Sequence, residues 1–174
     1  MTGSATTFPI GGIAPLPTRD RAALRDVSER MTMAGAQWRT LLASLDAPGL
    51  ARRSRPGAWS VAQLAHHTAD AHLHGLNRLR SALTTPGYVI QPFDQDAWLT
   101  LPDATLPVDV ALTLMGAATA HWTALLLGVD VEAFDTRILH PQEDEQDLWQ
   151  LVAKHDWHLR HHLAQARQAL EAGA

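Results

Sequence analysis

Four segments of roughly 20 residues repeat apolar side chains at the spacing of an amphipathic helix, and this pattern constrains the fold most strongly. The segments run from about residue 19 to 45, 61 to 83, 108 to 128 and 148 to 171. Strict apolar–polar alternation is nearly absent, and only residues 88–90 favour a short strand. The sequence therefore predicts an all-α fold, a four-helix bundle formed by residues 1–174 as a single domain.

Capping residues and helix breakers set the expected boundaries. Thr18 and Ser60 are suited to cap the first and second helices, and Pro107 fits the first turn of the third. Residues 1–17 hold three prolines and three glycines and are expected to form an extended N-terminal arm. Residues 85–107 hold four prolines and no helical period, which predicts a long connection of the kind that carries function or packs as a lid. Two further connections are expected to be loops, at residues 46–58 and 129–147.

The composition excludes several classes of protein. The absence of cysteine rules out disulfide scaffolds, thiolate nucleophiles and cysteine-based zinc or iron–sulfur sites. The net charge is -4 and no basic run exceeds the pair Arg52–Arg53, so neither a nucleic acid nor an anionic membrane is an expected partner. We find no signal-peptide pattern and expect no apolar stretch to reach the ~18 residues of a membrane span, so the predicted location is cytoplasmic.

Histidine is over-represented in this sequence. Ten occur in the chain, against a usual frequency of roughly 2%, and eight of them fall in two clusters, at residues 66–74 and 155–162. His158 and His162 lie on the apolar side of the last helix, four residues apart, the spacing by which one helix presents two imidazoles to one metal ion. His155 is two turns from His162, about 10 Å along the axis, which is too far for all three to bind one ion.

The second helix offers a third imidazole. His67 lies at the border of its apolar face, and His66 projects about 100° away. The line of His67 continues at three- and four-residue spacing through Asp70, Ala71, His74 and Arg78. Three protein ligands with an open position for water are typical of catalytic zinc, while a fourth ligand closes a structural site. The spacing therefore predicts a three-His metal site, and the alternative is a bundle with ordinary core histidines and no metal.

The two histidine clusters resemble the motifs of the DinB/YfiT-like family of metal proteins. The segment PGAWSVAQLAHHTADAH resembles the family's tryptophan–Ser/Thr–hydrophobic entry followed by HHxADxH, and WHLRHHLAQ is similar to its WHxxHHLA signature. FPIGG, IQPFDQDAW, HWTALL and LHP also resemble segments of the YfiT branch, so the resemblance covers nearly the whole chain. It implies a four-helix bundle of DinB/YfiT type with long connecting loops.

The resemblance also implies a metal site and an activity. In the YfiT branch the ligands are the second histidine of the HH pair and the first and last of HxxHH, which here are His67, His158 and His162. The implied cofactor is one divalent ion per subunit, zinc before nickel. The implied function is a metal-dependent hydrolase that activates water for attack on a small electrophilic substrate.

Relatives of this family leave two alternatives open. Some use bacillithiol or mycothiol, which implies a low-molecular-weight-thiol S-transferase that activates a thiol in place of water. A noncatalytic metal-binding stress-response bundle would keep the same ligands without turnover. The family habit, together with six tryptophans in a small chain, predicts a homodimer.

Two side chains outside the three histidines are candidate catalytic groups. Asp70, one turn after the first ligand, could orient an imidazole or a bound water, and the alternative is a solvated helix residue. His140, with Arg137 nearby, could supply an acid or an anion contact, and the alternative is a surface position. The sequence departs from the YfiT pattern at two places. Residues 142–145 are QEDE where the family has a glycine-containing turn, and His155 stands where an aromatic residue is expected. Four tryptophans are expected to be core or interface anchors: Trp59, Trp98, Trp122 and Trp157.

Overall fold

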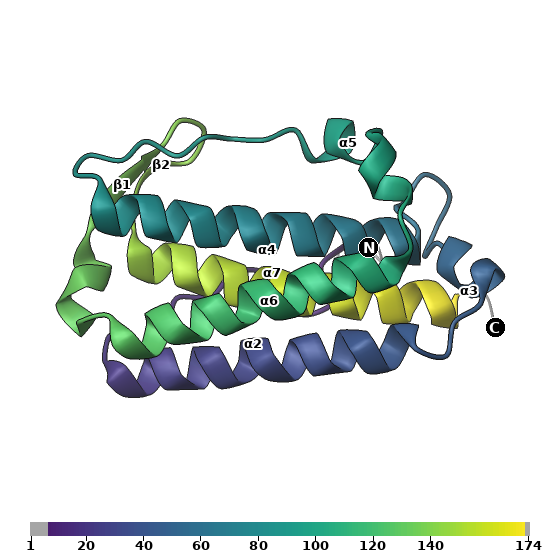
Figure 1. The fold of residues 1–174 in the computed structure, drawn as a ribbon, viewed down its shortest axis with the longest axis horizontal. Helices are drawn as coiled ribbons and strands as arrows, with labels where there is room; N and C mark the ends of the chain where they lie inside the picture. Colours follow the sequence, from purple (N-terminus) through teal and green to yellow (C-terminus); the bar gives the residue numbers. More distant parts are fainter. Residues whose placement is uncertain (1–6, 173–174) are drawn as a thin grey trace.

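Four long helices run side by side along the molecule in the computed structural model, which describes residues 7–172 (Figure 1). Helices α2 and α4 each pack against both α6 and α7, so the order around the bundle is α2, α6, α4, α7. The predicted all-α four-helix bundle is confirmed. The bounds of the long helices are α2 Arg21–Leu42, α4 Val61–Thr84, α6 Val108–Gly128 and α7 Leu148–Glu171.

Side-chain caps fix where the helices begin. Ser60 and Asp147 start α4 and α7 with reciprocal capping boxes, in which the cap side chain accepts a backbone N–H and a glutamine three residues on accepts the N–H of the cap. The start of α2 differs from the prediction, because Asp20 and not Thr18 accepts the N–H of the first turn, at 2.8 Å. Asp20 is the residue whose extended backbone directly precedes the helical turn, so its carboxylate reaches that donor.

Short elements occupy the predicted loops. Their sequences of four or five residues are too short to show a helical period, and side-chain caps start two of them, Asp46 for the first α-helix and Asp94 for the second. These elements are α3 (Ala47–Ala51), α5 (Gln95–Trp98) and the 3₁₀ helices η1 (Pro102–Thr105) and η2 (Val131–Asp135).

A small antiparallel hairpin precedes α7 and was not predicted. Strand β1 (Arg137–His140) pairs with β2 (Asp144–Asp147), whose sequence DEQD is polar throughout and therefore lacks the alternation of a strand. Val89 of the expected strand 88–90 forms a single parallel bridge with Leu139, so this segment joins β1 without forming a strand of its own. The hairpin thereby ties the start of the long connection to the start of α7.

The apolar core lies between the four helices and contains three of the tryptophans. Trp38 and Trp122 are fully buried, and their indole N–H groups donate to the carbonyls of Leu159 and His72, each at 3.1 Å. Trp149 is buried as well, and the other three tryptophans are partly buried. None of the six tryptophans is exposed, so their number does not support the predicted homodimer, which stays a prediction.

Helix α6 corrects a second expectation. Among the described residues it is the one helix long and apolar enough, by length and composition, to cross a membrane, with mean hydropathy 1.5 over an 18-residue window. Its many alanine and threonine residues break up any continuous run of large apolar side chains, which hid this property in the sequence. In the bundle α6 packs against α2 and α4, and 39% of the window is buried.

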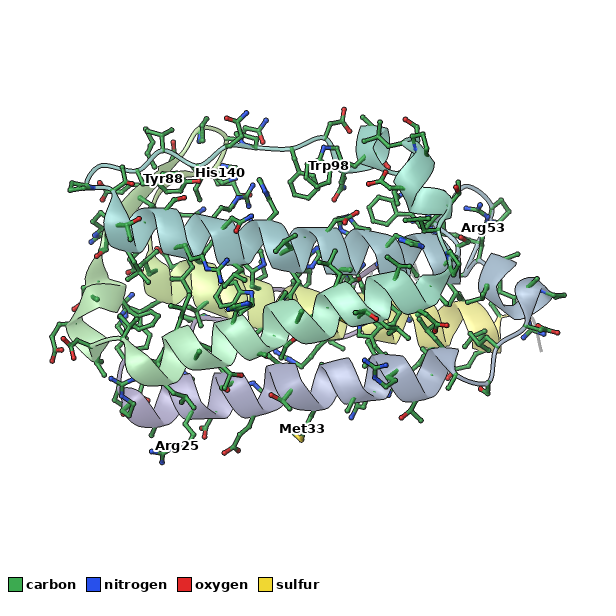
Figure 2. All side chains as sticks on the ribbon, viewed as in Figure 1. Arg25, Met33, Arg53, Tyr88, Trp98 and His140 are labelled. Carbon is green, nitrogen blue, oxygen red and sulfur yellow. The ribbon has the colours of Figure 1, made fainter. Side chains whose placement is uncertain are left out.

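The long connection 85–107 passes over the outer side of α4, where α5 lies (Figure 1). Figure 2 shows Tyr88, His140 and Trp98 on this side of the molecule, and Met33 at the opposite edge. Of the predicted N-terminal arm, residues 1–6 lie outside the described residues. The described part lies against α7, where the carbonyl of Gly11 accepts the indole N–H of Trp157 at 3.0 Å.

Candidate metal centre

Three imidazoles from the neighbouring helices α4 and α7 converge on one point. Nε2 of His158 lies 3.1 Å from Nε2 of His67 and 3.0 Å from Nε2 of His162, and the three potential ligand atoms all lie within 4.8 Å of one another. Nitrogens that share one zinc ion at ~2.0–2.1 Å are about 2.9–3.4 Å apart. The three histidines named from the sequence, called the triad below, therefore fit a single divalent ion.

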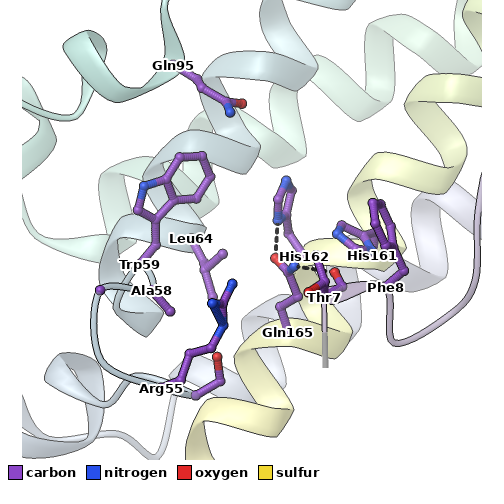
Figure 3. Close-up of a pocket in the computed structure, with 12 residues that line it drawn as sticks. Thr7, Phe8, Arg55, Ala58, Trp59, Leu64, Gln95, His161, His162 and Gln165 are labelled. Atoms are coloured by element: carbon purple, nitrogen blue, oxygen red, sulfur yellow. Dashed lines mark hydrogen bonds between the residues drawn. The ribbon is translucent and has the colours of Figure 1, made fainter. Parts of the chain in front are cut away.

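A hydrogen bond fixes the tautomer of one ligand. Oε1 of Gln165 accepts a hydrogen bond from Nδ1 of His162 at 2.8 Å, and the amide of Gln165 donates to the carbonyl of Thr7 at 3.0 Å (Figure 3). With the proton on Nδ1, the lone pair of His162 is on Nε2, the atom that faces the other two rings. An outer partner of this kind is the usual support of a histidine that binds a metal.

Burial keeps the triad neutral. Desolvation lowers the pKa of His67 to about 4, although the Asp96 carboxylate opposes it, and desolvation together with the His67 ring lowers the pKa of His162 to about 3. The pKa of His158 falls well below its ordinary value, first through desolvation and then through the two neighbouring imidazoles. Neutral imidazole is the form that binds a metal ion, so the site is ready for one at neutral pH.

Trp59 covers the triad where the chain enters α4. Its ring centroid lies 4.6 Å from that of His67 and 6.0 Å from that of His162. Its indole N–H donates to Asp96 at 3.0 Å, which ties α5 to the entry of α4. Trp59 is therefore part of the site, where the sequence suggested a core or interface anchor.

Two cavities meet the triad from different sides. The first, of about 360 Å³, is lined by Trp59, His162 and Gln165 among others (Figure 3). The second, of about 260 Å³, is lined by His67 and His158 together with polar side chains of α4, α7 and the hairpin. The side chain of Gln95 lines both.

His140 lies in the wall of the second cavity and is 5% exposed. Its Nδ1 accepts the backbone N–H of Gln142 at 3.2 Å, so the neutral ring carries its proton on Nε2, 3.6 Å from a carboxylate oxygen of Glu143. Glu143 in turn binds the ammonium of Lys154 at 2.7 Å. Desolvation lowers the pKa of His140, so its neutral form presents an N–H donor beside the cavity.

The other two candidates are placed elsewhere. Asp70 lies near Asp103 and His66, and its pKa is raised by burial and by the Asp103 carboxylate. Within residues 7–172 no hydrogen bond or ion pair joins Asp70 to the triad. Arg137 has a 65% exposed side chain and pairs across the hairpin with Glu145 at 3.2 Å. The structure therefore brings His140 towards the triad, but not Asp70 or Arg137.

Two further histidines of α4 hold the long connection in place. Nε2 of His66 donates to the carbonyl of Leu106 at 2.9 Å, and Nε2 of His74 donates to the carbonyl of Gln91 at 3.0 Å. His161 stacks on an α7 tryptophan, with ring centroids 4.2 Å apart. His66 and His161 thus lie outside the triad, as the helical geometry predicts.

His155 is the histidine that the family pattern does not anticipate. It is 5% exposed, lines the second cavity, and within the described residues neither of its ring nitrogens has a hydrogen-bond partner. Its ring lies against Gly75 of α4 so closely that a Cβ built there would be 2.1 Å from Cε1 of the ring. Only a residue without a side chain leaves room for this imidazole between α4 and α7.

Sequence reasoning missed several residues of the site. Gln165 follows His162 by one turn and Arg78 continues the line of His67, so helical spacing carried a signal for both. Lys154 and Trp59 gave no such signal, because their approach depends on how the hairpin and the entry of α4 pack.

Comparisons with known proteins show the family of the chain and match its fold. Residues 17–166 match the sequence profile of the DinB superfamily. A protein of Bacillus cereus (strain B4264) named "Putative metal-dependent hydrolase" is 35% identical over 120 residues, which are 69% of each chain, and one of Bacillus thuringiensis subsp. konkukian with that name is equally similar.

Two solved structures have related folds. YfiT from Bacillus subtilis, described as a probable metal-dependent hydrolase with an unusual four-helix bundle topology, is similar with a TM-score of 0.88 and 26% identity, over 97% of this chain and 96% of that one. The mycothiol-dependent maleylpyruvate isomerase shares the fold with a TM-score of 0.65 and 15% identity, over 82% of this chain and 60% of that one.

Proposed function

The chain belongs to the DinB superfamily, and on this premise we propose that it is a metal-dependent hydrolase whose triad holds one divalent ion, zinc in preference to nickel. The observation that carries the proposal is the approach of three Nε2 atoms, at 3.0 and 3.1 Å, from rings that burial keeps neutral. The names of its Bacillus relatives and the likeness to YfiT support the same reaction class.

Different residues of the site would have different roles in hydrolysis. The triad would hold the ion, which would supply a bound water with a pKa lowered to about 7 and would polarise a carbonyl group. Trp59 and Phe93 pack on the ring of His67 and exclude solvent from that side. His140, neutral with its proton on Nε2, lines the second cavity and donates a hydrogen bond to the departing group of a small substrate.

The two cavities favour one second candidate, a low-molecular-weight-thiol S-transferase. A transferase must hold a thiol and its electrophilic acceptor at one centre at the same time. Cavities of about 360 and 260 Å³ that both reach the triad offer a place for each molecule. The triad suits this reaction too, since a bound divalent cation stabilises a thiolate.

Metal content tests the site directly. Protein purified without a histidine tag is expected to hold one ion per chain by plasma mass spectrometry, and His162→Ala to hold none. His161→Ala is the matched control, because this neighbouring ring stacks on tryptophan and is not one of the three potential ligands. The proposed site would be refuted if His162→Ala and wild type held equal amounts of metal. It would also be refuted if wild type held no metal after dialysis against a zinc-containing buffer.

The reaction is tested on the metal-loaded protein with ester and amide panels, and with an electrophilic acceptor in the presence or absence of bacillithiol. Turnover without thiol that His162→Ala lacks supports the hydrolase. Thiol-dependent loss of the acceptor supports the transferase. Failure of both reactions with metal bound would leave a noncatalytic metal-binding bundle.

A further inference from the structure

Arg78 is a buried cation that no carboxylate of the described chain neutralises. The residue is 6% exposed, and its one hydrogen bond is from Nη2 to the carbonyl of Gln91 at 3.0 Å. Nε of Arg78 is buried and has no partner, and the guanidinium lies 5.9 Å from the ring centroid of Phe93. A guanidinium stays charged in a protein, and a buried charge is costly unless an opposite charge pairs with it.

Among residues 7–172, the one acid that lines the same cavity is already engaged. Both carboxylate oxygens of Glu143 contact the ammonium of Lys154, and one of them also accepts the amide N–H of Gln146 at 2.9 Å. No carboxylate of residues 7–172 lies within the 4.0 Å of an ion pair with Arg78. With its histidines neutral, the second cavity has two cationic groups against one anionic group, and its net charge is positive.

The unpaired guanidinium and the triad face one cavity. Arg78, His67 and His158 all line the space of about 260 Å³. Arg78 follows His67 by eleven residues, about 16 Å along the axis of α4, and helical side chains lean towards the N-terminus, which brings the guanidinium nearer to the triad. A molecule that is bound at the triad and extends along this cavity would therefore meet Arg78 with its other end.

We propose that Arg78 binds a carboxylate group of the molecule that reacts at the triad, so that the substrates of this protein are small carboxylic acids. Arg78 donates from the free positions of its Nη atoms, and the planar fork matches a carboxylate. The reacting atom then lies at the triad, several bonds away from the carboxylate. This inference rests on the proposed function for the place of reaction, but the anion site itself depends only on Arg78.

The test uses probes that differ only in charge at one end. Linear mercaptocarboxylates from mercaptoacetate to mercaptohexanoate, and mercaptoalcohols of the same lengths, are titrated into the zinc-loaded and the metal-free protein by calorimetry. The sulfur end is the same in each pair, so the ratio of the two affinities reports the carboxylate alone. Arg78→Gln keeps a donor for Gln91, Arg78→Lys keeps the charge without the fork, and Arg137→Gln is the control at an arginine that already has a partner.

At one or more chain lengths, wild type and Arg137→Gln are expected to prefer the carboxylate about tenfold or more, the effect of one charge-assisted hydrogen bond. The preference should disappear in Arg78→Gln and be partly retained in Arg78→Lys. If only the metal-free protein prefers the carboxylate, and this preference depends on Arg78, the anion site is supported and the proposed metal site is not. A preference that is absent in wild type at every length in both forms, or that is unchanged in Arg78→Gln, would overturn the proposal.

Discussion

Replacing Gly75 by alanine tests a close contact between the helices that carry the triad. In most helix interiors this change stabilises a protein by about 1 kcal/mol, because glycine is the poorer helix former. Here the new Cβ would lie 2.1, 2.3 and 2.5 Å from three atoms of the His155 ring, well inside the separation of real Cβ contacts. The ring must move by more than 1 Å, and overpacking of this kind costs typically about 1–3 kcal/mol.

The two effects oppose each other, so Gly75→Ala should lower the free energy of unfolding by about 0–2 kcal/mol in the wild-type background. In a His155→Ala background the obstacle is gone, and the same change should raise the free energy of unfolding by about 1 kcal/mol. The coupling between the two positions is then about 1–3 kcal/mol.

Urea denaturation of metal-free protein, followed by far-UV circular dichroism, measures all four members of this cycle. Gly116→Ala on α6 is the control, because the nearest atom to its Cβ is 3.7 Å away at the end of the Arg39 side chain. This control should gain the full helix-propensity term. If Gly75→Ala stabilises wild type as much as it stabilises His155→Ala, the packing of His155 against Gly75 is not as described.

Three further predictions concern stability and assembly. Burial lowers the pKa of His72 to about 4, so as the pH falls below 6.5 the unfolded chain binds a proton before the folded protein does. The free energy of unfolding, measured by urea denaturation with EDTA, should therefore drop by about 2 kcal/mol from pH 7 to pH 5 through this residue, and by less in His72→Gln. Ser60→Ala removes a capping box and should lower the free energy of unfolding by about 1 kcal/mol, which thermal melts would contradict if Tm is unchanged. We propose that the chain forms a homodimer through the outer side of α6, where Val110 and Leu127 are 46% and 44% exposed. Sedimentation should give twice the chain mass of 19.0 kDa for wild type and a monomer for the double variant Val110→Glu/Leu127→Glu, and a monomeric wild type would reject the proposal.

Helical periodicity was sufficient to predict the bundle and the triad. The side chains of His158 and His162 are one turn apart on one helix. When the apolar faces of α4 and α7 pack against each other, His67 is placed next to them. These features follow from patterns within single helices. The family motifs selected the same three residues.

What the sequence did not show depends on contacts between distant segments. Strand β2 has no apolar pattern, and its pairing is set by the turn from His140 to Asp144. Asp70 follows His67 by nearly one turn, yet the packing of η1 places Asp103 beside it. The opposite holds for Arg78, whose position in the line of His67 was visible but whose lack of a carboxylate partner is a property of the whole fold.

The long connection is held to α4 through its main chain. His66 donates to the carbonyl of Leu106, and His74 and Arg78 donate to that of Gln91. A backbone carbonyl is the same whichever side chain its residue bears, so these anchors do not depend on the identity of the residues they hold. A side chain of the connection such as Gln95, which lines both cavities, can thus change without loosening these anchors. Over evolutionary time, a protein built in this way can exchange one substrate for another without rebuilding the helices that carry its chemistry.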